Sequence, residues 1–289
     1  MNRPLTNAGR VSAATTGTAA TTAARYALLL LFAATTLFPL IWMGYSSFKT
    51  NAEISQSTFA LPSSLRFDNY VNAWNTARIG DYFFNSVLVS AASVVATALL
   101  GAAAAFILAK FRFGGRKLVY GLFIVGMLIP LQAVLVPLFS QMRDLRLLDT
   151  YRSLILVYTA FGLPTTIFLM ESFITAFPDS IMEASIIDGA SAPRIFLSVI
   201  LPMCGPVVAT TSILNFLTNW KEFSFALVFL TSEAKKTLPL GLYNFLGAYT
   251  ADYAGLMAAL TIATLPTLLL YLALQDRIIT GMTAGAVKG

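Results

Sequence analysis

The sequence contains no histidine and only one cysteine, Cys204. Histidine is the most common general base and the most common metal ligand in proteins. A lone cysteine cannot form an internal disulfide or a cysteine-based metal cage. We therefore expect no catalytic residue, no metal site and no cofactor, and we interpret Cys204 as a small buried apolar residue.

Charged residues are also scarce. They make up 11% of the 289 residues, hydrophobic residues make up 57%, and the mean hydropathy is +0.75. Soluble domains are about one quarter charged, and a soluble core of this length could not bury so much apolar surface. The composition therefore indicates a membrane protein in contact with lipid. The net charge of +6 does not indicate a nucleic-acid partner, because the basic residues are scattered between membrane-length apolar runs.

Six apolar runs are long enough, or nearly so, to cross a bilayer at about 1.5 Å per residue. We predict an all-α polytopic membrane protein with six transmembrane helices, the fifth of which begins near Pro206 and ends near Leu230. The runs are 26–45, 82–109, 118–142, 153–170, 195–220 and 253–275.

The predicted order begins with a disordered cytoplasmic tail at 1–24 and a first transmembrane helix at 25–46. An external loop at 47–81, with a short helix near 69–76, precedes a five-helix transmembrane domain at 82–277 and a cytoplasmic tail at 278–289. The loop KFRFGGRK at 110–117 has four basic residues and no acid, which places it and both termini in the cytoplasm. The loop RDLRLLDTYR at 143–152 puts three arginines on the outer side, so the orientation depends on the denser inner loop.

The stretch MEASIIDGASAPRIFLSVILP at 182–202 is unusually polar for its surroundings. Ser180 and Glu183 have the spacing of a capping box, so we expect a helix to begin at Ser180. Gly189 suits the left-handed position that ends a helix, and Pro193 suits the first turn of the next. The pattern predicts two short helices joined by a sharp turn.

The first of these short helices has apolar residues around most of its circumference, which favours a helix inserted between proteins over a helix lying on lipid. These residues are Ile181, Met182, Ile186 and Ile187. Spacing alone fits an ordinary capped loop equally well.

The composite pattern of this stretch resembles the EAA loop of ABC importer permeases. It consists of Glu183, Ala184, Ser185, Asp188, Gly189 and Ala190, followed by a downstream Leu-Pro. Ser185 replaces the second alanine of the family motif. The segments FPLIWMGYSSFK, FNSVLVS, FILAKFRFGGRK, MLIPLQAVLVPLF, LPTTIFLMESFITAFPDSIMEAS, TLPLGL and GMTAGAVKG extend the likeness over roughly residues 26–289. Together they resemble the permeases of maltose-type sugar importers.

This resemblance implies a type I ABC importer permease fold in a cell (inner) membrane, with a coupling loop at 174–205. It implies that the six residues from Glu183 to Ala190 dock onto an ATPase. The implied partners are a second homologous permease, two ATP-binding cassette ATPase subunits, an extracytoplasmic solute-binding protein and a sugar-like solute. ATP hydrolysis would take place in the ATPases, so this chain would not be an enzyme. The C-terminal residues TAGAVKG would either approach the ATPases or form a frayed end.

A second polar group lies in the fifth apolar run. It consists of Asn215, Asn219, Trp220, Lys221 and Glu222. Charges inside a membrane cost about 2.5–3.5 kcal/mol on insertion scales and normally face a cavity or a partner. We therefore interpret the group as a lining of the solute path. The alternative is that Lys221 and Glu222 lie at the outer interface, with their charged ends in water.

Two other functional classes remain open to test. A stand-alone secondary carrier or channel for a small polar solute would not respond to ATPase mutations. An intramembrane enzyme is disfavoured because the sequence has no histidine and no pair of nucleophile and base.

Overall fold

The structure, a computed structural model of the chain, describes residues 9–246 and 251–286. Within those residues the regular elements are all helices, as predicted. The α-helices are α1 Gly9–Ser46, α2 Asn51–Gln56, α3 Asp68–Val71, α4 Ile79–Lys110, α5 Arg116–Gly126, α6 Leu135–Asp144, α7 Tyr151–Thr175, α8 Asp179–Ile187, α9 Ala192–Ile195, α10 Leu201–Met203, α11 Gly205–Trp220, α12 Ser224–Phe229, α13 Leu238–Leu242 and α14 Tyr253–Ala286. Shorter π or 3-10 turns are η1 Asn72–Thr76, η2 Leu131–Val134, η3 Phe196–Ile200, η4 Glu233–Lys235 and η5 Tyr243–Phe245.

Four described helices are long and apolar enough to cross a membrane. They are Thr21–Ser46 of α1, the whole of α4 and α7, and Tyr253–Leu274 of α14. Two bent pairs raise the number to six if each pair counts as one span. The first pair is α5 with α6, and the second joins Ala192–Met203 to α11.

The third predicted span is broken. We expected one helix over 118–142, but α5 ends at Gly126 and the chain bends by 98° before α6. Pro130 lies in this break and has an extended backbone. Proline disfavours a helical conformation in the residue before it and has no N–H to donate, so a continuous helix through this position is unfavourable. Pro137 lies in the first turn of α6, where a missing N–H costs nothing, and Pro164 is accommodated inside α7.

The fifth predicted span begins where expected and ends too early. α11 starts at Gly205, next to Pro206, but it stops at Trp220 rather than near Leu230. Residues 221–223 interrupt the helix, and α12 begins at Ser224 as a separate short helix. The prediction for the end of this span is therefore wrong, because hydrophobicity alone did not reveal the break.

The predicted N-terminal tail differs from the structure. Residues 9–24, expected to be disordered, form the first part of α1, and residues 1–8 lie outside the described residues. Alanine has the highest helix propensity, and an alanine-rich stretch can extend a helix that is already nucleated. At the other end α14 continues to Ala286, so the predicted cytoplasmic tail at 278–289 begins within this helix, and residues 287–289 are also outside the described part.

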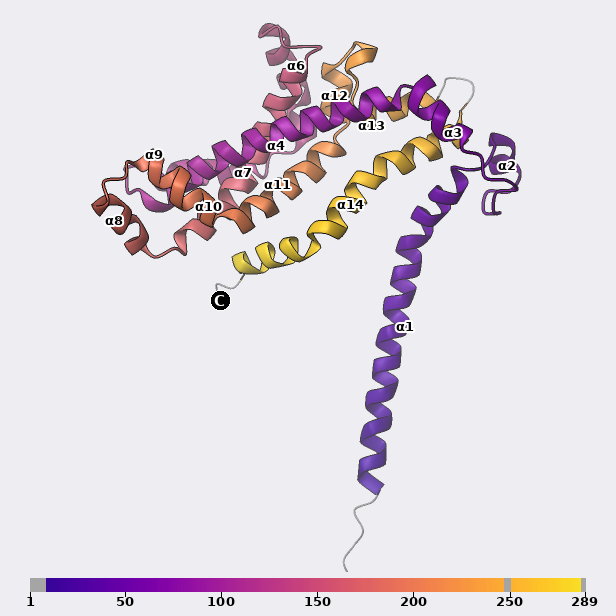
Figure 1. The fold of residues 1–289 in the computed structure, drawn as a ribbon, viewed down its shortest axis with the longest axis horizontal. Coiled ribbons are helices and arrows are strands. Elements are labelled where there is room, and N and C mark those ends of the chain that lie inside the picture. Colours follow the sequence, from indigo (N-terminus) through magenta and orange to yellow (C-terminus); the bar gives the residue numbers. More distant parts are fainter. Residues whose placement is uncertain (1–8, 247–250, 287–289) are drawn as a thin grey trace, which may run out of the picture.

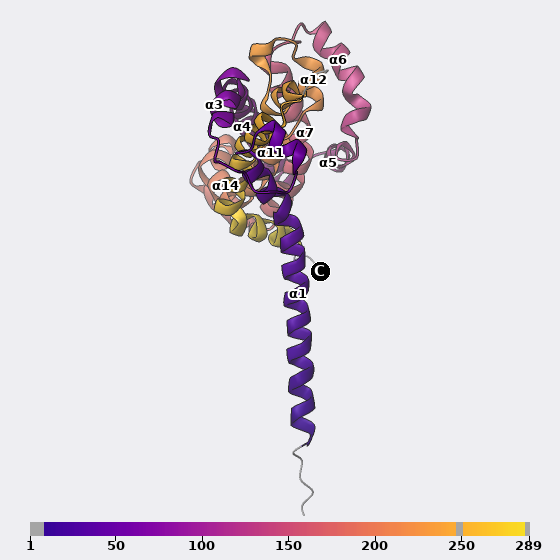
Figure 2. The same ribbon diagram turned by 90° about the vertical axis from the view of Figure 1, so that its right-hand side faces the viewer.

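The helical body has α4 and α7 side by side and parallel. Lys110, the last residue of α4, reaches Asp179 just after α7, while Asn85 near the start of α4 bonds Tyr151 at the start of α7. α11 packs against both helices and α14 packs against α11. In Figures 1 and 2, α1 projects from this body as a long isolated helix and meets the rest only near its end.

The body therefore has two ends. The α8 end contains residues 110–117 and 176–204. The α3 end contains the loop after α1, the loop before α7 and the segment from η4 to the start of α14, which hydrogen bonds join together. α3 and η1 cover 68–76, close to the short helix predicted near 69–76.

Candidate functional site

α8 begins at Asp179, directly after Pro178. No side chain caps its first turn, so the predicted capping box between Ser180 and Glu183 is wrong. Asp179 takes the place nearest the helix N-terminus, where a carboxylate interacts well with the helix dipole. A hydrogen bond from Lys110, together with the positive charge of that lysine, lowers the pKa of Asp179.

Lys110 fixes the position of α8. Its side chain is only 4% exposed. Its Nζ donates to Oδ1 of Asp179 at 2.8 Å and to the carbonyl oxygen of Phe177 at 2.7 Å. The sequence reading used Lys110 only as a topological signal and missed this contact, which joins residues 69 positions apart.

The predicted turn after α8 is present. Gly189 has a φ of +76°, which an L-residue with a side chain rarely adopts. Its N–H donates to the carbonyl oxygen of Ile186 at 2.9 Å, and the N–H of Ala190 donates to Ser185 at 3.0 Å. α9 then begins with Pro193 in its first turn, as expected. In Figure 1, α8 and α9 lie together at one extremity of the body.

α8 turns one side to its own chain and the other to solvent. Met182 and Ala190 pack against the buried cluster that includes Met170, Ile174 and Ile195. Ile186, one turn after Met182, is 58% exposed, and Ile187 is 85% exposed. The predicted docking residues Glu183, Ala184, Asp188 and Gly189 are also exposed, whereas Ser185 and Ala190 are partly buried. Ser185 uses its hydroxyl to bond the carbonyl oxygen of Ile181 at 2.8 Å.

The exposed surface of α8 therefore contains two isoleucines, Ile186 and Ile187, next to the unpaired carboxylate of Glu183. The side chain of Glu183 makes no hydrogen bond or ion pair within the described residues. A large apolar side chain exposed this far is uncommon unless it contacts another molecule, especially beside other exposed apolar groups. This geometry fits a helix that enters a socket on a partner.

A second feature is a small polar cavity of about 120 Å³ between α7 and α11. Tyr158, Thr165, Thr211, Thr218, Asn215 and Asn219 supply its polar lining. Asn215 is held in place because its Nδ2 donates to Oγ1 of Thr166 at 2.9 Å and to the carbonyl oxygen of Thr211 at 2.8 Å. Nδ2 of the buried Asn219 has no partner in the part of the chain that the structure describes. Two of the five predicted path residues thus meet in one cavity.

The other three path candidates take different positions. Trp220 is buried, donates from Nε1 to the carbonyl oxygen of Ala263 at 3.0 Å, and stacks on Phe216 with ring centroids 5.4 Å apart. It packs against these groups and does not line this cavity. Lys221 is exposed at the end of α11.

Glu222 has a structural role. Its Oε1 accepts from the N–H of Phe225 at 2.8 Å, and its Oε2 accepts from the N–H of Ala226 at 3.3 Å. These are the free donors of the first turn of α12, so the side chain caps that helix. Oε2 also accepts from the hydroxyl of Tyr158 at 2.7 Å. The carboxylate therefore links α12 to the edge of the cavity without lining it.

The α3 end carries polar contacts that the sequence reading did not find. Asp149 binds the chain just after α12, and Glu233 accepts from the hydroxyl of Tyr82 and, at 2.7 Å, from Nδ2 of Asn244. Only the mixed polarity of the loops marked them, because the partners are far apart in the sequence.

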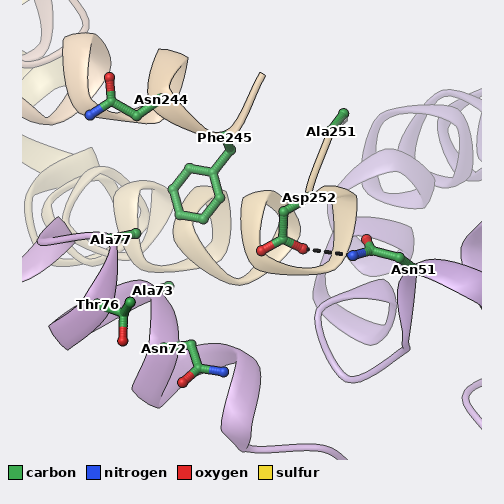
Figure 3. A pocket seen from close by; sticks show the side chains of 9 residues that line it. All are labelled: Asn51, Asn72, Ala73, Thr76, Ala77, Asn244, Phe245, Ala251 and Asp252. Carbon is green, nitrogen blue, oxygen red and sulfur yellow. Dashed lines mark hydrogen bonds between the residues drawn. The ribbon is translucent and has the colours of Figure 1, made fainter. Parts of the chain in front are cut away.

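An open pocket of about 490 Å³ lies beside these contacts (Figure 3). The polar residues among those that line it are Asn51, Asn72, Thr76, Asn244 and Asp252. Asn51 is fixed at one side, since its Nδ2 donates to Oδ1 of Asp252 at 3.0 Å and its Oδ1 accepts from the N–H of Ala254 at 2.8 Å. No group of three His, Cys, Asp or Glu side chains suited to a metal occurs among the described residues.

Comparison with known families identifies the chain. Residues 98–283 match the family described as "Binding-protein-dependent transport system inner membrane component". The chain belongs to this family. The matched range runs from the second half of α4 into α14, so α8, its turn and the polar cavity are all part of the family domain.

Curated members of this permease family are similar over nearly their whole length. The chain is 40% identical over 265 residues to the diacetylchitobiose uptake system permease protein NgcG of Streptomyces coelicolor, covering 91% of this chain and 88% of that one. It is 35% identical over 269 residues to the multiple sugar-binding transport system permease protein MsmG of Streptococcus mutans, covering 91% and 96%.

Solved structures show the same permease fold. A chain from the crystal structure of a bacterial ABC transporter involved in the import of the acidic polysaccharide alginate matches with a TM-score of 0.78 and 23% identity, over 95% of this chain and 99% of that one. The expected ABC importer permease fold is therefore confirmed, and the family is an inner-membrane one.

Proposed function

We propose that this permease forms half of the translocation path for a sugar or sugar-like solute in an ATP-driven importer. Relatives that are 35–40% identical are named for diacetylchitobiose uptake and for multiple sugar-binding transport, which supports a saccharide as the solute class. The observation that carries the proposal is the α8 helix, which is anchored by Lys110 and presents Ile186, Ile187 and Glu183 to solvent.

In this proposal α8 docks into a cleft of a cytoplasmic ATPase. Ile186 and Ile187 would supply the apolar anchor, and Glu183 would face a basic group of the cleft. Ala184, Asp188 and Gly189 share the exposed surface, while Ser185 and Ala190 support it from behind. Movement of the ATPases on binding ATP would then pass through the Lys110 contact into α4 and the body.

The remaining partners follow from the same arrangement. A second homologous permease would complete the path and cover α1, whose most apolar membrane-length window is unburied in this chain. Two ATPase subunits would lie at the α8 end, where ATP would be hydrolysed outside this chain. An extracytoplasmic solute-binding protein would dock at the α3 end. Both termini would lie in the cytoplasm.

The solute would pass beside the cavity of Asn215 and Asn219. Their amides can donate to and accept from hydroxyl groups, which is the chemistry that a saccharide offers. Lys221, exposed at the end of α11, stays a candidate for the outer part of this path.

The docking proposal can be tested with matched variants of α8. Glu183→Lys reverses the charge of the exposed face, and Gly189→Val forces a β-branched residue to a φ of +76°. We expect both to abolish co-purification of the ATPases and solute uptake, while membrane insertion and pairing with the second permease persist. Gly189→Asn is the control, because asparagine tolerates the left-handed region and no atom lies within 4 Å of the added Cβ.

The controls define what each outcome means. Gly189→Asn should retain ATPase binding, which separates backbone geometry from side-chain volume. A basic-to-acidic change in the ATPase cleft should partly restore Glu183→Lys and leave Gly189→Val inactive. Normal ATPase binding and uptake in both variants would refute docking through α8. Uptake that survives an inactivated ATPase would instead favour a stand-alone carrier or channel.

A further inference from the structure

A groove of about 580 Å³ at the α8 end runs between the last turns of α4 and the start of α9. Ala103, Phe106 and Ile107 form the α4 wall, and Pro193 and Phe196 form the opposite wall. Phe111 and Phe113 close it from the loop that follows α4. Arg112 is the only charged residue among those that line the groove. The groove is thus an apolar channel with one cation at its edge.

Packing holds the walls of the groove in place. Phe106 is buried and stacks on Phe196 with centroids 5.6 Å apart. Phe111 meets Phe106 edge to face at 5.4 Å. Lys110, next in the chain to Phe111, is locked to Phe177 and Asp179. The groove is therefore preformed, with Ile107 and Phe113 about half exposed at its mouth.

The charges beside the groove are only partly neutralised. Among the four basic residues of 110–117, Lys110 pairs with Asp179 at 2.8 Å and Arg116 pairs with Glu171 at 3.3 Å. Arg112 and Lys117 are exposed and form no ion pair with any described residue. The positive charge of Arg112 contributes slightly to the lowered pKa of Asp179, but the Asp179 carboxylate is hydrogen-bonded to Lys110 and not to Arg112.

The two unpaired cations share a second recess. It has a volume of about 340 Å³, is lined by Arg112, Phe113, Gly115, Arg116 and Lys117, and adjoins the groove through Arg112 and Phe113. Gly115 opens this recess, since its φ of +87° turns the chain and no atom lies within 4 Å of the position of a Cβ. The apolar groove and the cationic recess therefore meet at Arg112 and Phe113.

We propose that this double recess binds an anionic phospholipid, with an acyl chain in the groove and the phosphate at Arg112 and Lys117. The groove continues the apolar surface of α4, which is long enough to span the membrane, so hydrocarbon can reach it from the bilayer. Basic residues near a membrane surface attract anionic lipid head groups. A zwitterionic lipid offers the same phosphate, but its choline group would add a positive charge beside Arg112 and Lys117 and leave the head group without net charge. Free phosphate would leave the apolar channel without a matching group. The site goes beyond the proposed function, since it requires neither a particular sugar nor docking through α8.

The test uses the full importer, purified with its partner permease and ATPases, depleted of lipid and then titrated. Native mass spectrometry would count bound phosphatidylglycerol, phosphatidylcholine with the same chains, and glycerol phosphate as the head group alone. We expect phosphatidylglycerol to bind well, phosphatidylcholine to bind at least about tenfold more weakly, and glycerol phosphate to show no retained binding. The double variant R112Q/K117Q should weaken phosphatidylglycerol binding about 30-fold, or roughly fivefold for each cation.

Two further variants separate charge from shape. Ala103→Leu fills the groove and leaves every charge in place, and it should also reduce phosphatidylglycerol binding. R66Q/R152Q removes the same number of charges from two exposed arginines at the α3 end and should leave binding unchanged. Unchanged phosphatidylglycerol binding in both R112Q/K117Q and Ala103→Leu would overturn the proposal, as would equal binding of the two lipids. Loss of the ATPases from R112Q/K117Q with lipid binding intact would assign the surface to a protein contact instead.

Discussion

Lys235 bonds Asp149 at two atoms. Its Nζ lies 2.9 Å from Oδ2 and 2.6 Å from the main-chain oxygen of Asp149. Oδ1 of Asp149 also accepts from the N–H groups of Thr231 at 3.1 Å and Ser232 at 2.9 Å, and the hydroxyl of Ser232 donates to Oδ2. One carboxylate therefore joins the loop before α7 to the segment after α12, more than 80 residues away.

This carboxylate makes stability depend on pH. Hydrogen bonds from Ser232, Lys235 and Thr231 hold the pKa of Asp149 well below its ordinary value of 3.8. A lowered folded-state pKa contributes stability that is present above the unfolded value and is lost as pH falls through the folded value. We expect Asp149→Asn to lower stability at pH 7 by about 1.5–3 kcal/mol, the value of hydrogen bonds to a charged group. Asparagine tolerates the φ of 54° at this position.

Thermal unfolding of the purified importer from pH 7 down to pH 3 would measure the effect. The difference between wild type and Asp149→Asn should be greatest at pH 7 and shrink below about pH 4. Asp144→Asn is the control, because Asp144 is exposed and pairs only with its neighbour Arg143, a contact worth about 0–1 kcal/mol. A constant difference at every pH would show that the charge of Asp149 contributes nothing.

At Gly162 in α7, side chains of α4 and α11 lie close to the backbone. A Cβ added there in α7 would lie 2.8 Å from Cγ2 of Thr97 in α4 and would collide with Oδ1 of Asn215 in α11. We expect Gly162→Ala to cost about 1–3 kcal/mol by overpacking and to reduce uptake, because Asn215 must move out of its place in the cavity. Gly121→Ala in α5, where nothing lies within 4 Å, is the matched control and should be neutral or stabilising. Equal melting temperatures for the two variants would contradict this packing.

Glu222 should affect folding more than solute recognition. Glu222→Ala removes the acceptor for the first turn of α12 and should lower stability by about 0.5–2 kcal/mol. Glu222→Gln keeps one acceptor oxygen and should be milder, and Tyr158→Phe should couple to Glu222→Ala in a double-mutant cycle. The KM for solute uptake by the folded fraction of Glu222→Ala should equal that of the wild type. A large change in KM without loss of stability would return Glu222 to the solute path.

Lys221→Met tests the neighbouring position, where the structure shows an exposed cation at the end of α11. If the ammonium group contributes to the path, uptake should fall several-fold while assembly is unchanged, since methionine keeps the length of the apolar stem. Uptake assays and co-purification of the partner subunits would measure the two effects. Wild-type uptake in this variant would remove Lys221 from the path.

Single cysteines in a Cys204→Ser background test the orientation. Gly114 lies in the loop after α4 at the α8 end and Ser57 lies at the α3 end, and both are exposed. Gly114 is preferable to Gly115, whose positive φ would strain a cysteine. We expect an impermeant thiol reagent applied outside to label Ser57→Cys and to leave Gly114→Cys unlabelled until the membrane is opened. Labelling of both from outside would refute cytoplasmic placement of the α8 end.

Several features could be predicted from the sequence because they depend on local properties. Apolar composition and run length determine that the chain is all-helical and fits a membrane. The turn at Gly189 follows from one residue's freedom at positive φ, and the EAA-like spacing around it is continuous in the chain. These local features also carry the resemblance to the permease family.

Other features depended on residues that meet only in three dimensions. Trp220 stacks on Phe216 of its own helix and donates to the carbonyl oxygen of Ala263 in α14, a contact that the sequence could not reveal. Glu222 was predicted only as an intramembrane charge, and the structure adds that its carboxylate accepts from the first turn of α12. The capping box at Ser180 failed because Pro178 lets the helix begin at Asp179, where Lys110 binds the first carboxylate.

The loop 110–117 has one property that the sequence predicts and another that only the tertiary structure reveals. Its four basic residues are evident in the sequence and indicate its side of the membrane. Only the tertiary structure decides that Lys110 and Arg116 are neutralised by Asp179 and Glu171 while Arg112 and Lys117 remain free beside an apolar groove. The reason is physical: hydrophobicity and backbone preference act over a few residues, whereas an ion pair depends on where the fold brings two distant side chains together.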